Sequence, residues 1–575
     1  MSLVATFISC VFLFAGQSPP DTIRQHYEKA EAARAAGNLS TAETEYTAIL
    51  GEGYERLGAV YLALEDYQHA IPALQAAVGY RANAPATLIE LAIAYYGSEQ
   101  YARALEPADQ ASKLDPDNVG AHQMLGKTYF MLGDLGRSIT ELEIAAKLSP
   151  NDVDVSYTLG VAYLRNRQPE VAKKLYQSMI QVFGDRPQLH VVIGRAYRQS
   201  GLLKDAAAEF KKAIALDPHF PRAHYYLGIT YLLDEGQSQM DQALAEFQVE
   251  LAANPDEFFA NYYRGVVYIF QRKWDLAVPP LQKAAAIQPD NPDPYFQLGQ
   301  AYQELNQHEQ AIEVLKKAIA FNPDLGHNKG QVSTAHHRLA QSLLKTGHVE
   351  AGQRELQIAS DLKAQVFKLE QQSQSSGSGM GAAKLPETKD LLDPALAHGV
   401  AATGDVDDGT KQKLRGSDVY FKKVVAAAHN NVGLLRAERQ DFRGAVEHFA
   451  LAAKWDPRLE GVDYNLGLAY YKSGLYKEAT APLEAELKEH PANRPARLIL
   501  GMSWFMLGKA LLERGERVQG IENLERAVQL DPDQPEFHGQ LGQAYLTAGR
   551  RAEGEREIEI AKQLKSKIRD PKAPQ

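Results

Sequence analysis

The chain has 575 residues, of which 45% are hydrophobic and 23% charged, a balance typical of a soluble folded protein. Its net charge of −10 excludes the strongly basic surface that nucleic-acid binding normally requires, so DNA or RNA is not expected as a partner. The single cysteine, Cys10, excludes a disulfide framework and a cysteine-based metal site.

The amino terminus carries an apolar run of 13 residues, from Leu3 to Ala15. This length suits the hydrophobic region of a signal peptide and is shorter than the ~20 residues that span a bilayer. No Lys or Arg precedes Arg24, so a capping helix or a misassigned start codon stays open as an alternative. We expect residues 1–18 to be an export signal that brings residues 1–16 close to a membrane. A periplasmic or secreted location follows, with a cytoplasmic location as the alternative.

A unit of two amphipathic helices around a polar turn recurs along most of the chain. Each first helix has an apolar anchor followed by a small residue, and an aromatic residue stands three positions later. In four consecutive units the small residues are 34 positions apart: Gly126, Gly160, Gly194 and Gly228, followed by Tyr129, Tyr163, Tyr197 and Tyr231. One such hairpin cannot bury both of its apolar faces, so it requires neighbours on either side.

The period of 34, with glycine, aromatic, alanine and proline at constant offsets, resembles the tetratricopeptide repeat. The resemblance implies an all-α fold, a right-handed α-solenoid of about 14 stacked helix-turn-helix hairpins in two arrays. It also implies that the first helices of the hairpins line a concave groove. Because a solenoid grows by stacking, the length of the chain does not require several globular domains.

The spacing of the repeats predicts the organisation of the first array, over residues 21–370, with about ten repeats. Its first repeat is degenerate, because the next anchor, Leu57, follows after only 28 residues. We therefore expect a short loop around Gly51-Glu52-Gly53. Residues 371–416 are rich in Gly and Ser and have no apolar period, which predicts a flexible linker or insertion.

The pattern resumes in a second array of about four repeats, over residues 417–568, with residues 569–575 as a tail. In its third unit, the glycine at position 508 fits the anchors that follow better than the glycine at position 501. The first helix of that unit is accordingly expected to be long, from Arg494 to Glu513.

A search for catalytic motifs finds none of the common ones. The sequence contains no phosphate-binding GxxxxGK[ST], no dinucleotide-binding G-x-G-x-x-G after a strand, no G-x-S-x-G and no H-E-x-x-H. Asp405–Gly409 resembles the start of a calcium loop, but Gly416 stands where the bidentate Glu is required. The sequence thus predicts a non-catalytic protein without metal or cofactor.

A partner-binding strip is predicted on the first helices near the middle of the first array. The residues that the resemblance places there are Arg195, Arg198, Arg222, Tyr225, Phe259, Tyr262, Phe270, Phe296 and Gln300. Aromatic rings with arginine at one end suit a trough for a protein or peptide segment. The alternative is that these rings fill the packing between adjacent hairpins. We therefore expect a protein-interaction scaffold. The competing interpretations are an accessory factor in a cell-envelope, polysaccharide or secretion assembly, and an enzyme with an unrecognised site.

Overall fold

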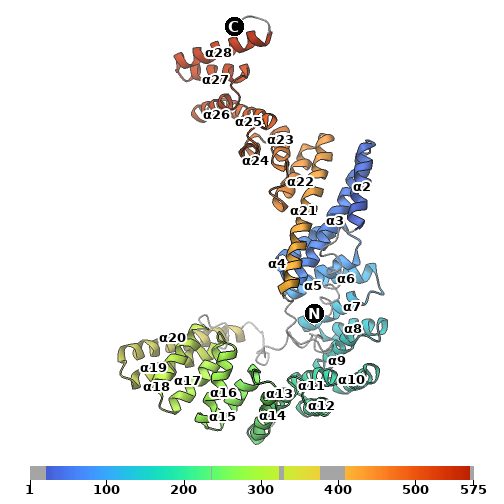
Figure 1. Ribbon diagram of the computed structural model, residues 1–575, viewed down its shortest axis with the longest axis vertical. Coiled ribbons are helices and arrows are strands. Elements are labelled where there is room, and N and C mark those ends of the chain that lie inside the picture. Colours follow the sequence, from blue (N-terminus) through green and yellow to red (C-terminus); the bar gives the residue numbers. More distant parts are fainter. Residues whose placement is uncertain (1–20, 235, 323–328, 376–407, 570–575) are drawn as a thin grey trace. The chain divides into compact units, whose positions relative to one another are not determined.

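The computed structural model describes residues 21–234, 236–322, 329–375 and 408–569 (Figure 1). These ranges contain 27 α-helices and one 3-10 helix, and no strand is present in them. The expected export signal at residues 1–18 lies outside the described residues. So do the central part of the expected linker and nearly all of the expected tail. The all-α solenoid of helical hairpins is confirmed.

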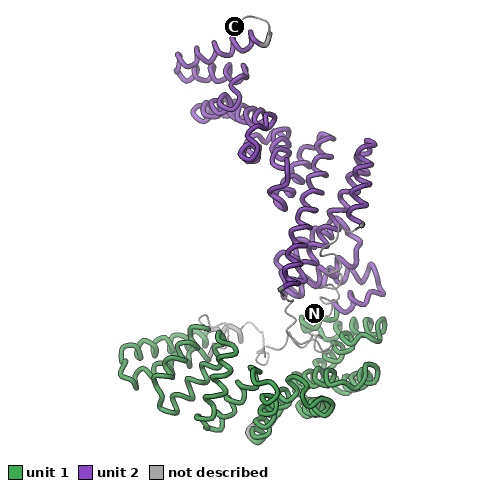
Figure 2. The backbone as a smooth tube through the Cα atoms, viewed as in Figure 1, with its two compact units in different colours: residues 1–2, 125–404 green, residues 3–124, 405–575 purple. Residues whose placement is uncertain are grey.

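The described chain forms two compact units, and the grouping follows contacts rather than chain order (Figure 2). Unit 1 contains residues 125–375. Unit 2 contains residues 21–124 together with residues 408–569, so its two segments are far apart in the sequence. Helix α7 (Val119–Leu132) passes from one unit into the other.

Unit 1 is a run of hairpins. Its helices are α8 (Leu135–Leu148), α9 (Val153–Arg165), α10 (Pro169–Phe183), α11 (Pro187–Gln199), α12 (Leu203–Leu216), α13 (Ala223–Asp234), η1 (Gly236–Gln239), α14 (Met240–Ala253), α15 (Phe258–Phe270), α16 (Trp274–Ile287), α17 (Pro292–Glu304), α18 (His308–Ala320), α19 (Lys329–Lys345) and α20 (Val349–Ser375). Helices of odd number are the first helices of their hairpins.

Unit 2 contains the first and last hairpins of the chain. Its helices are α2 (Asp21–Ala35), α3 (Leu39–Ala63), α4 (Tyr67–Tyr80), α5 (Pro85–Gly97), α6 (Tyr101–Leu114), α21 (Asp408–Glu438), α22 (Phe442–Trp455), α23 (Val462–Lys472), α24 (Tyr476–Glu489), α25 (Arg494–Glu513), α26 (Arg517–Leu530), α27 (Pro535–Thr547) and α28 (Arg551–Arg569). The expected long first helix from Arg494 to Glu513 is confirmed as α25.

The small residue of the first helix leaves space in which a large side chain of the second helix packs. A Cβ atom added at Gly160 would lie 2.3 Å from the ring of Tyr176, and one added at Gly194 would lie 2.7 Å from the ring of Phe210. Both rings are fully buried. The two helices of a hairpin approach this closely only because one of them has no side chain at the contact.

The turn inside the hairpins also repeats, except between α13 and α14, where η1 lies between the two helices. The first helix ends in a residue with positive φ, for example Gly133 (φ 82°) and Arg167 (φ 58°). The next N–H then bonds back to a carbonyl five residues earlier, as from Asp134 to Tyr129. The residue in the left-handed conformation lets the following N–H groups bond to carbonyls that have no partner within the helix, and it reverses the chain within a few residues.

One sequence expectation is wrong. Residues 51–53 form no loop, because α3 continues unbroken from Leu39 to Ala63 and serves two hairpins, the first with α2 and the second with α4. The two glycines are buried helical residues that permit close contacts. A Cβ on Gly51 would lie 2.6 Å from Arg81, and one on Gly53 would lie 3.0 Å from Val425 of α21.

The segment expected as a linker, residues 371–416, is helical at both of its described ends. Helix α20 continues to Ser375, α21 begins at Asp408, and residues 376–407 lie outside the described ranges. With α3 counted twice, the helices pair into ten hairpins before this segment and four after it. Nowhere in the described ranges is a helix both long enough and apolar enough to span a bilayer.

Candidate functional site

The predicted partner-binding strip falls on α11, α13, α15 and α17 of unit 1 and on the turn before α13, and its residues differ in exposure. Arg195, Arg198 and Tyr225 are buried, whereas Phe259 is 36% and Phe270 is 65% exposed. The remaining members, which are half-buried, are Arg222, Tyr262, Phe296 and Gln300.

Most members of the strip contact a neighbouring hairpin. The Tyr225 ring of α13 is stacked on the Phe259 ring of α15, with 5.7 Å between centroids. The guanidinium carbons of Arg195 and Arg198, on α11, lie 5.6 and 5.4 Å from the ring centroid of Tyr226 on α13. These contacts tie consecutive first helices together, so part of the strip has the packing role that the sequence left as an alternative.

Arg222 is the member of the strip with the most constrained geometry. It lies in the turn before α13 with a φ of 64°. Its Nε atom is 3.2 Å from a carboxylate oxygen of Glu257, whose side chain is buried. Its guanidinium carbon is 5.8 Å from the Phe259 ring centroid. The backbone conformation and the ion pair thus hold a cationic group beside an exposed aromatic ring.

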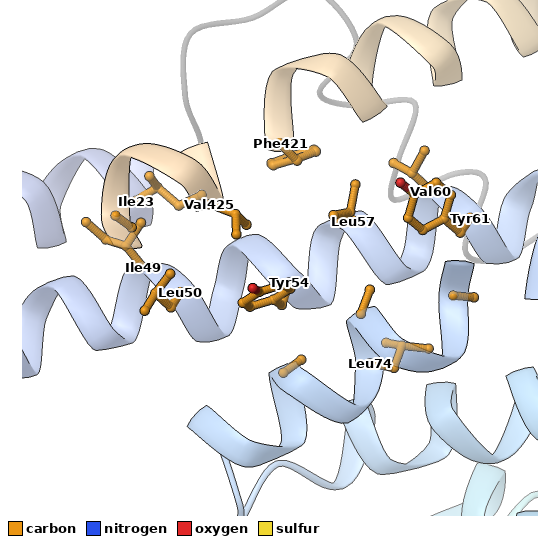
Figure 3. Packing of buried hydrophobic residues seen from close by; sticks show 14 of the residues in the cluster. Ile23, Ile49, Leu50, Tyr54, Leu57, Val60, Tyr61, Leu74, Phe421 and Val425 are labelled. Atoms are coloured by element: carbon orange, nitrogen blue, oxygen red, sulfur yellow. The ribbon is translucent and has the colours of Figure 1, made fainter. Parts of the chain in front are cut away.

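A second candidate site, which the sequence analysis did not anticipate, lies inside unit 2. Helices α3 and α21 pack against each other, and Figure 3 shows side chains of both helices in one apolar cluster. We call this pair, with the side chains that join it, the α3–α21 junction. Phe421 and Val425 of α21 belong to the same buried cluster as Leu50 and Leu57 of α3. Most of the contact is therefore apolar.

Polar contacts show that the two helices are antiparallel. At one end of the junction, Glu43 of α3 pairs with Arg439 and, at 3.2 Å, with Arg436 of α21. At the other end, Tyr61 of α3 lies near Asp418 of α21, and the Nζ atom of Lys422, also on α21, is 5.7 Å from the Tyr61 ring centroid. As the numbering rises along α3, that of its partner along α21 falls.

The junction joins two related elements. Helices α3–α4 and α21–α22 share a pattern at a constant offset of 375 residues, with Gly58 matching Gly433 and the N-cap Asp66 matching Asp441. With this offset, the Glu43–Arg436 contact corresponds to the Tyr61–Asp418 contact with the two helices exchanged. The junction therefore has approximate two-fold symmetry.

The contacts of a repeated tyrosine show which position α21 occupies beside α3. In four hairpins, the tyrosine three positions after the small residue bonds to the second helix of the preceding hairpin, 20 residues earlier; the pairs are Tyr95–Gln75, Tyr163–Glu143, Tyr302–Gln282 and Tyr545–Glu525. Tyr61 occupies this tyrosine position in α3, and its partner Asp418 comes from α21. The first half of α21 thus takes the place of a preceding second helix.

A histidine–glutamate pair closes many of the hairpins. The histidine of the first helix bonds through Nδ1 to a glutamate of the second helix, at 2.5 to 2.6 Å. The pairs are His26–Glu45, His190–Glu209, His224–Glu246, His336–Glu355 and His538–Glu557. In four of the five the separation is 19 residues, and His224–Glu246 spans the longer turn that contains η1. At His190 and His224, hydrogen bonds to carboxylates outweigh the effect of burial and raise the pKa of the imidazole.

The α21–α22 hairpin departs from this pattern. Its histidine, His429, is also followed 19 residues later by a partner, but that partner is His448, with 2.9 Å between the two Nδ1 atoms. The Nε2 atom of His429 is 2.8 Å from Oη of Tyr54, and this oxygen accepts a hydrogen bond of 2.8 Å from Nε1 of Trp455. The chain of contacts crosses the junction from α22 through α21 to α3.

The electrostatics of this chain differ from those of the histidine–glutamate pairs. Burial, aided by the neighbouring His448, lowers the pKa of His429 to about 3. Burial and the nearby Arg436 guanidinium also lower the pKa of His448. In unit 1, by contrast, the hydrogen bond from His224 to the Glu246 carboxylate raises the pKa of His224. Both junction histidines are therefore neutral near pH 7.

The described residues contain no group of three or more His, Cys, Asp or Glu side chains arranged to hold a metal ion. What they do contain is a long series of stacked helical hairpins with buried inter-hairpin contacts, which defines a helical-repeat solenoid. Stacked hairpins of this kind present extended surfaces to partners, so the general function that they support is a scaffold for protein–protein interaction.

Family models identify the repeat. One model, described as TPR repeat, matches residues 194–234 and 508–549. Two described as tetratricopeptide repeat match residues 269–329, and residues 55–119, 89–153 and 232–292. The chain is a multi-repeat tetratricopeptide-repeat protein.

Solved structures that resemble parts of the chain include several of MamA. MamA from Desulfovibrio magneticus RS-1 is 23% identical, with 32% of this chain and 97% of that chain covered and a TM-score of 0.28. Another MamA crystal structure is 22% identical over 31% of this chain and 97% of the other, also with a TM-score of 0.28. Scores this low add nothing to what the helices themselves show. No curated protein matches the sequence significantly.

Proposed function

We propose that this protein is a non-catalytic scaffold that holds a segment of a partner protein against the first helices of unit 1. The observation that carries the proposal is the exposed aromatic surface at α15. Phe259 and Phe270 are exposed on this helix, and among the described residues no other first helix of unit 1 has an exposed Phe, Tyr or Trp. Large exposed rings held on a rigid helix are typical anchor points of protein interfaces.

The surroundings of Phe259 favour a partner segment with an apolar side chain next to a hydrogen-bond acceptor. One face of Phe259 is supported by Tyr225, so the ring has little freedom to lose on binding. Arg222, held by Glu257, lies beside the ring and is itself partly exposed. A backbone carbonyl or a carboxylate next to the anchoring side chain would accept a hydrogen bond from this guanidinium.

Photo-crosslinking in the native cell tests this proposal. A photoreactive phenylalanine analogue is placed at Phe259 or Phe270 of the full chain, and the matched control carries it at Val182 on α10, a second helix. Val182 is also an exposed apolar residue. We expect a discrete protein adduct from the two α15 positions and none from position 182. Equal adducts at all three positions, or none at α15, would contradict the proposal.

An exported location belongs to the same proposal, and its support is the apolar run of residues 3–15. Fractionation of the cell, followed by N-terminal sequencing of the mature protein, tests it. A mature chain that retains Met1 and is recovered from the cytoplasm would contradict export.

A further inference from the structure

We propose that the α3–α21 junction is an acid-sensitive contact, in which protons taken up by His429 and His448 loosen α21 and α22 from α3 while the hairpins of unit 1 stay closed. The proposal is independent of the partner-binding function. It rests on one exception in a repeated structure, because five hairpins pair a histidine with a glutamate, whereas the hairpin at the junction pairs two histidines.

The hydrogen bonds of the junction are satisfied when both imidazoles are neutral. The Trp455 indole donates to Oη of Tyr54, the Tyr54 hydroxyl donates to a bare Nε2 of His429, and Nδ1–H of His429 donates to a bare Nδ1 of His448. Each contact in this arrangement has one proton. It therefore needs no charge within the apolar contact between the helices.

Added protons disturb this arrangement in two stages. The first added proton goes to Nε2 of His429, so the Tyr54 hydroxyl must turn and accept a hydrogen bond from it; the two Nδ1 atoms still share one proton, but a cation now lies inside the contact. A second proton gives both Nδ1 atoms an N–H, so the bond of 2.9 Å between them becomes a repulsion. His190 and His224 respond in the opposite way, because hydrogen bonds to carboxylates raise their pKa values and stabilise the charged imidazole.

The charged groups around the pair do not supply the missing carboxylate contact. Within the described residues, neither ring has a carboxylate as hydrogen-bond partner. The groups that face His429 are Tyr54 of α3, Tyr80 of α4 and His448 of α22. The charged groups near His448 are Arg436 of α21, Glu43 of α3, and Asp441 and Glu447 of the α22 hairpin. Of these, Arg436 adds to the cost of a cation, and it is itself engaged by Glu43.

The direction of the pH effect follows from the proton balance. Histidines whose pKa is lowered in the closed state bind fewer protons there than when the junction is open. The stabilisation is therefore complete above the ordinary histidine pKa of about 6.5 and is lost progressively as the pH falls below it.

The size of the effect follows from the same balance. Between pH 7.5 and 5.5, a histidine that is neutral when closed and has an ordinary pKa when open changes the opening equilibrium by about tenfold. Two such histidines change it by up to about 100-fold. Apolar packing such as that of Phe421 and Val425 keeps the junction mostly closed, so the assay must detect rare opening.

Hydrogen–deuterium exchange of the intact chain detects such opening, because amide protection scales inversely with the opening equilibrium. After correction for intrinsic exchange rates, we expect the protection of α3 and α21 amides to fall by up to about 100-fold between pH 7.5 and 5.5. Peptides from α11 and α12, which carry the His190–Glu209 pair, are the internal control and should keep their protection.

Two variants decide the cause. His448→Glu restores the histidine–glutamate pair, and we expect α3 and α21 to keep their protection at pH 5.5. His448→Gln removes one titrating group but keeps an amide that can accept a hydrogen bond, and should reduce the effect to about tenfold. Circular dichroism checks that each variant is folded. Equal protection of the wild-type junction at both pH values would overturn the proposal. An equal loss in α11 and α12, or an undiminished loss in either folded variant, would do the same.

Discussion

Replacing Phe421 by alanine should weaken the α3–α21 junction without unfolding the repeats on either side. Phe421 lies on α21, is only 5% exposed, and belongs to the apolar cluster that also contains Leu50 and Leu57 of α3. Truncation of a buried phenylalanine costs about 3–5 kcal/mol, through the lost burial and the cavity that is left. If this cost falls on the junction, it corresponds to a loss of affinity between about 100-fold and about 4,000-fold.

The affinity becomes measurable when the chain is cut between the two segments of unit 2. A site for a sequence-specific protease, introduced within residues 376–407, yields two pieces after cleavage of the full chain. The wild-type pieces should remain associated on dilution, because the junction joins them. We expect the Phe421→Ala pieces to separate at a concentration at least 100-fold higher, as measured by analytical ultracentrifugation.

A matched substitution separates a weakened junction from general destabilisation. Leu483 of α24 is equally buried in the second array but belongs to a different apolar cluster. Leu483→Ala should lower the stability of that array by a similar 2–5 kcal/mol and leave the association of the pieces unchanged. If wild-type pieces separate at once, or if the two variants dissociate alike, α3 and α21 do not form the contact described here.

Three further outcomes follow from the packing. Gly160→Ala should lower the free energy of unfolding by about 1–3 kcal/mol in urea titration, because the added methyl group meets the buried Tyr176 ring. Gly416→Ala, in α21 with no atom within 4 Å of the added Cβ, should instead raise it by about 0.5–1 kcal/mol; a loss would contradict the described helix. His224, whose pKa is raised by Glu246, stabilises unit 1 below about pH 6.5 and less as the pH rises through its folded-state value. Glu246→Gln should therefore lose more stability at pH 6 than at pH 8, and an equal loss at both would refute this assignment.

The repeated features of the fold were predictable because each was encoded many times. The glycine at position 160 and the tyrosine at position 163 recur at the same offsets in successive units, and the structure shows what each one contacts. The long α25 was also predictable, since the glycine at position 508 keeps the register of the anchors that follow it. Local periodicity is sufficient for such features because each hairpin contacts only its neighbours.

The junction was not predicted, since it departs from that regularity. Gly53 reads as a chain breaker in a sequence, yet in α3 it is a helical residue that lets Val425 approach. The signal that could have revealed the contact is the match between α3–α4 and α21–α22 at an offset of 375 residues. That signal is visible only when the two arrays are compared with each other rather than each with the consensus.

The predicted binding strip was only partly recognisable for a related reason. Periodicity shows that Tyr225 and Phe259 are on consecutive first helices, but not that one ring supports the other. The burial of Arg195 and Arg198 depends on the tyrosine at position 226, which the next hairpin contributes. Exposure is a property of neighbouring hairpins together, so a pattern read from one hairpin does not determine it.

The direct contact between α3 and α21 has a mechanical consequence. Residues 21–124 and 408–569 belong to one unit, so tension applied between the two ends of the described chain would pass through this helix pair. The repeats of residues 125–375 would then carry no load until the pair gave way. In a pulling experiment, the force would accordingly reach the intervening hairpins only after the α3–α21 contact had ruptured.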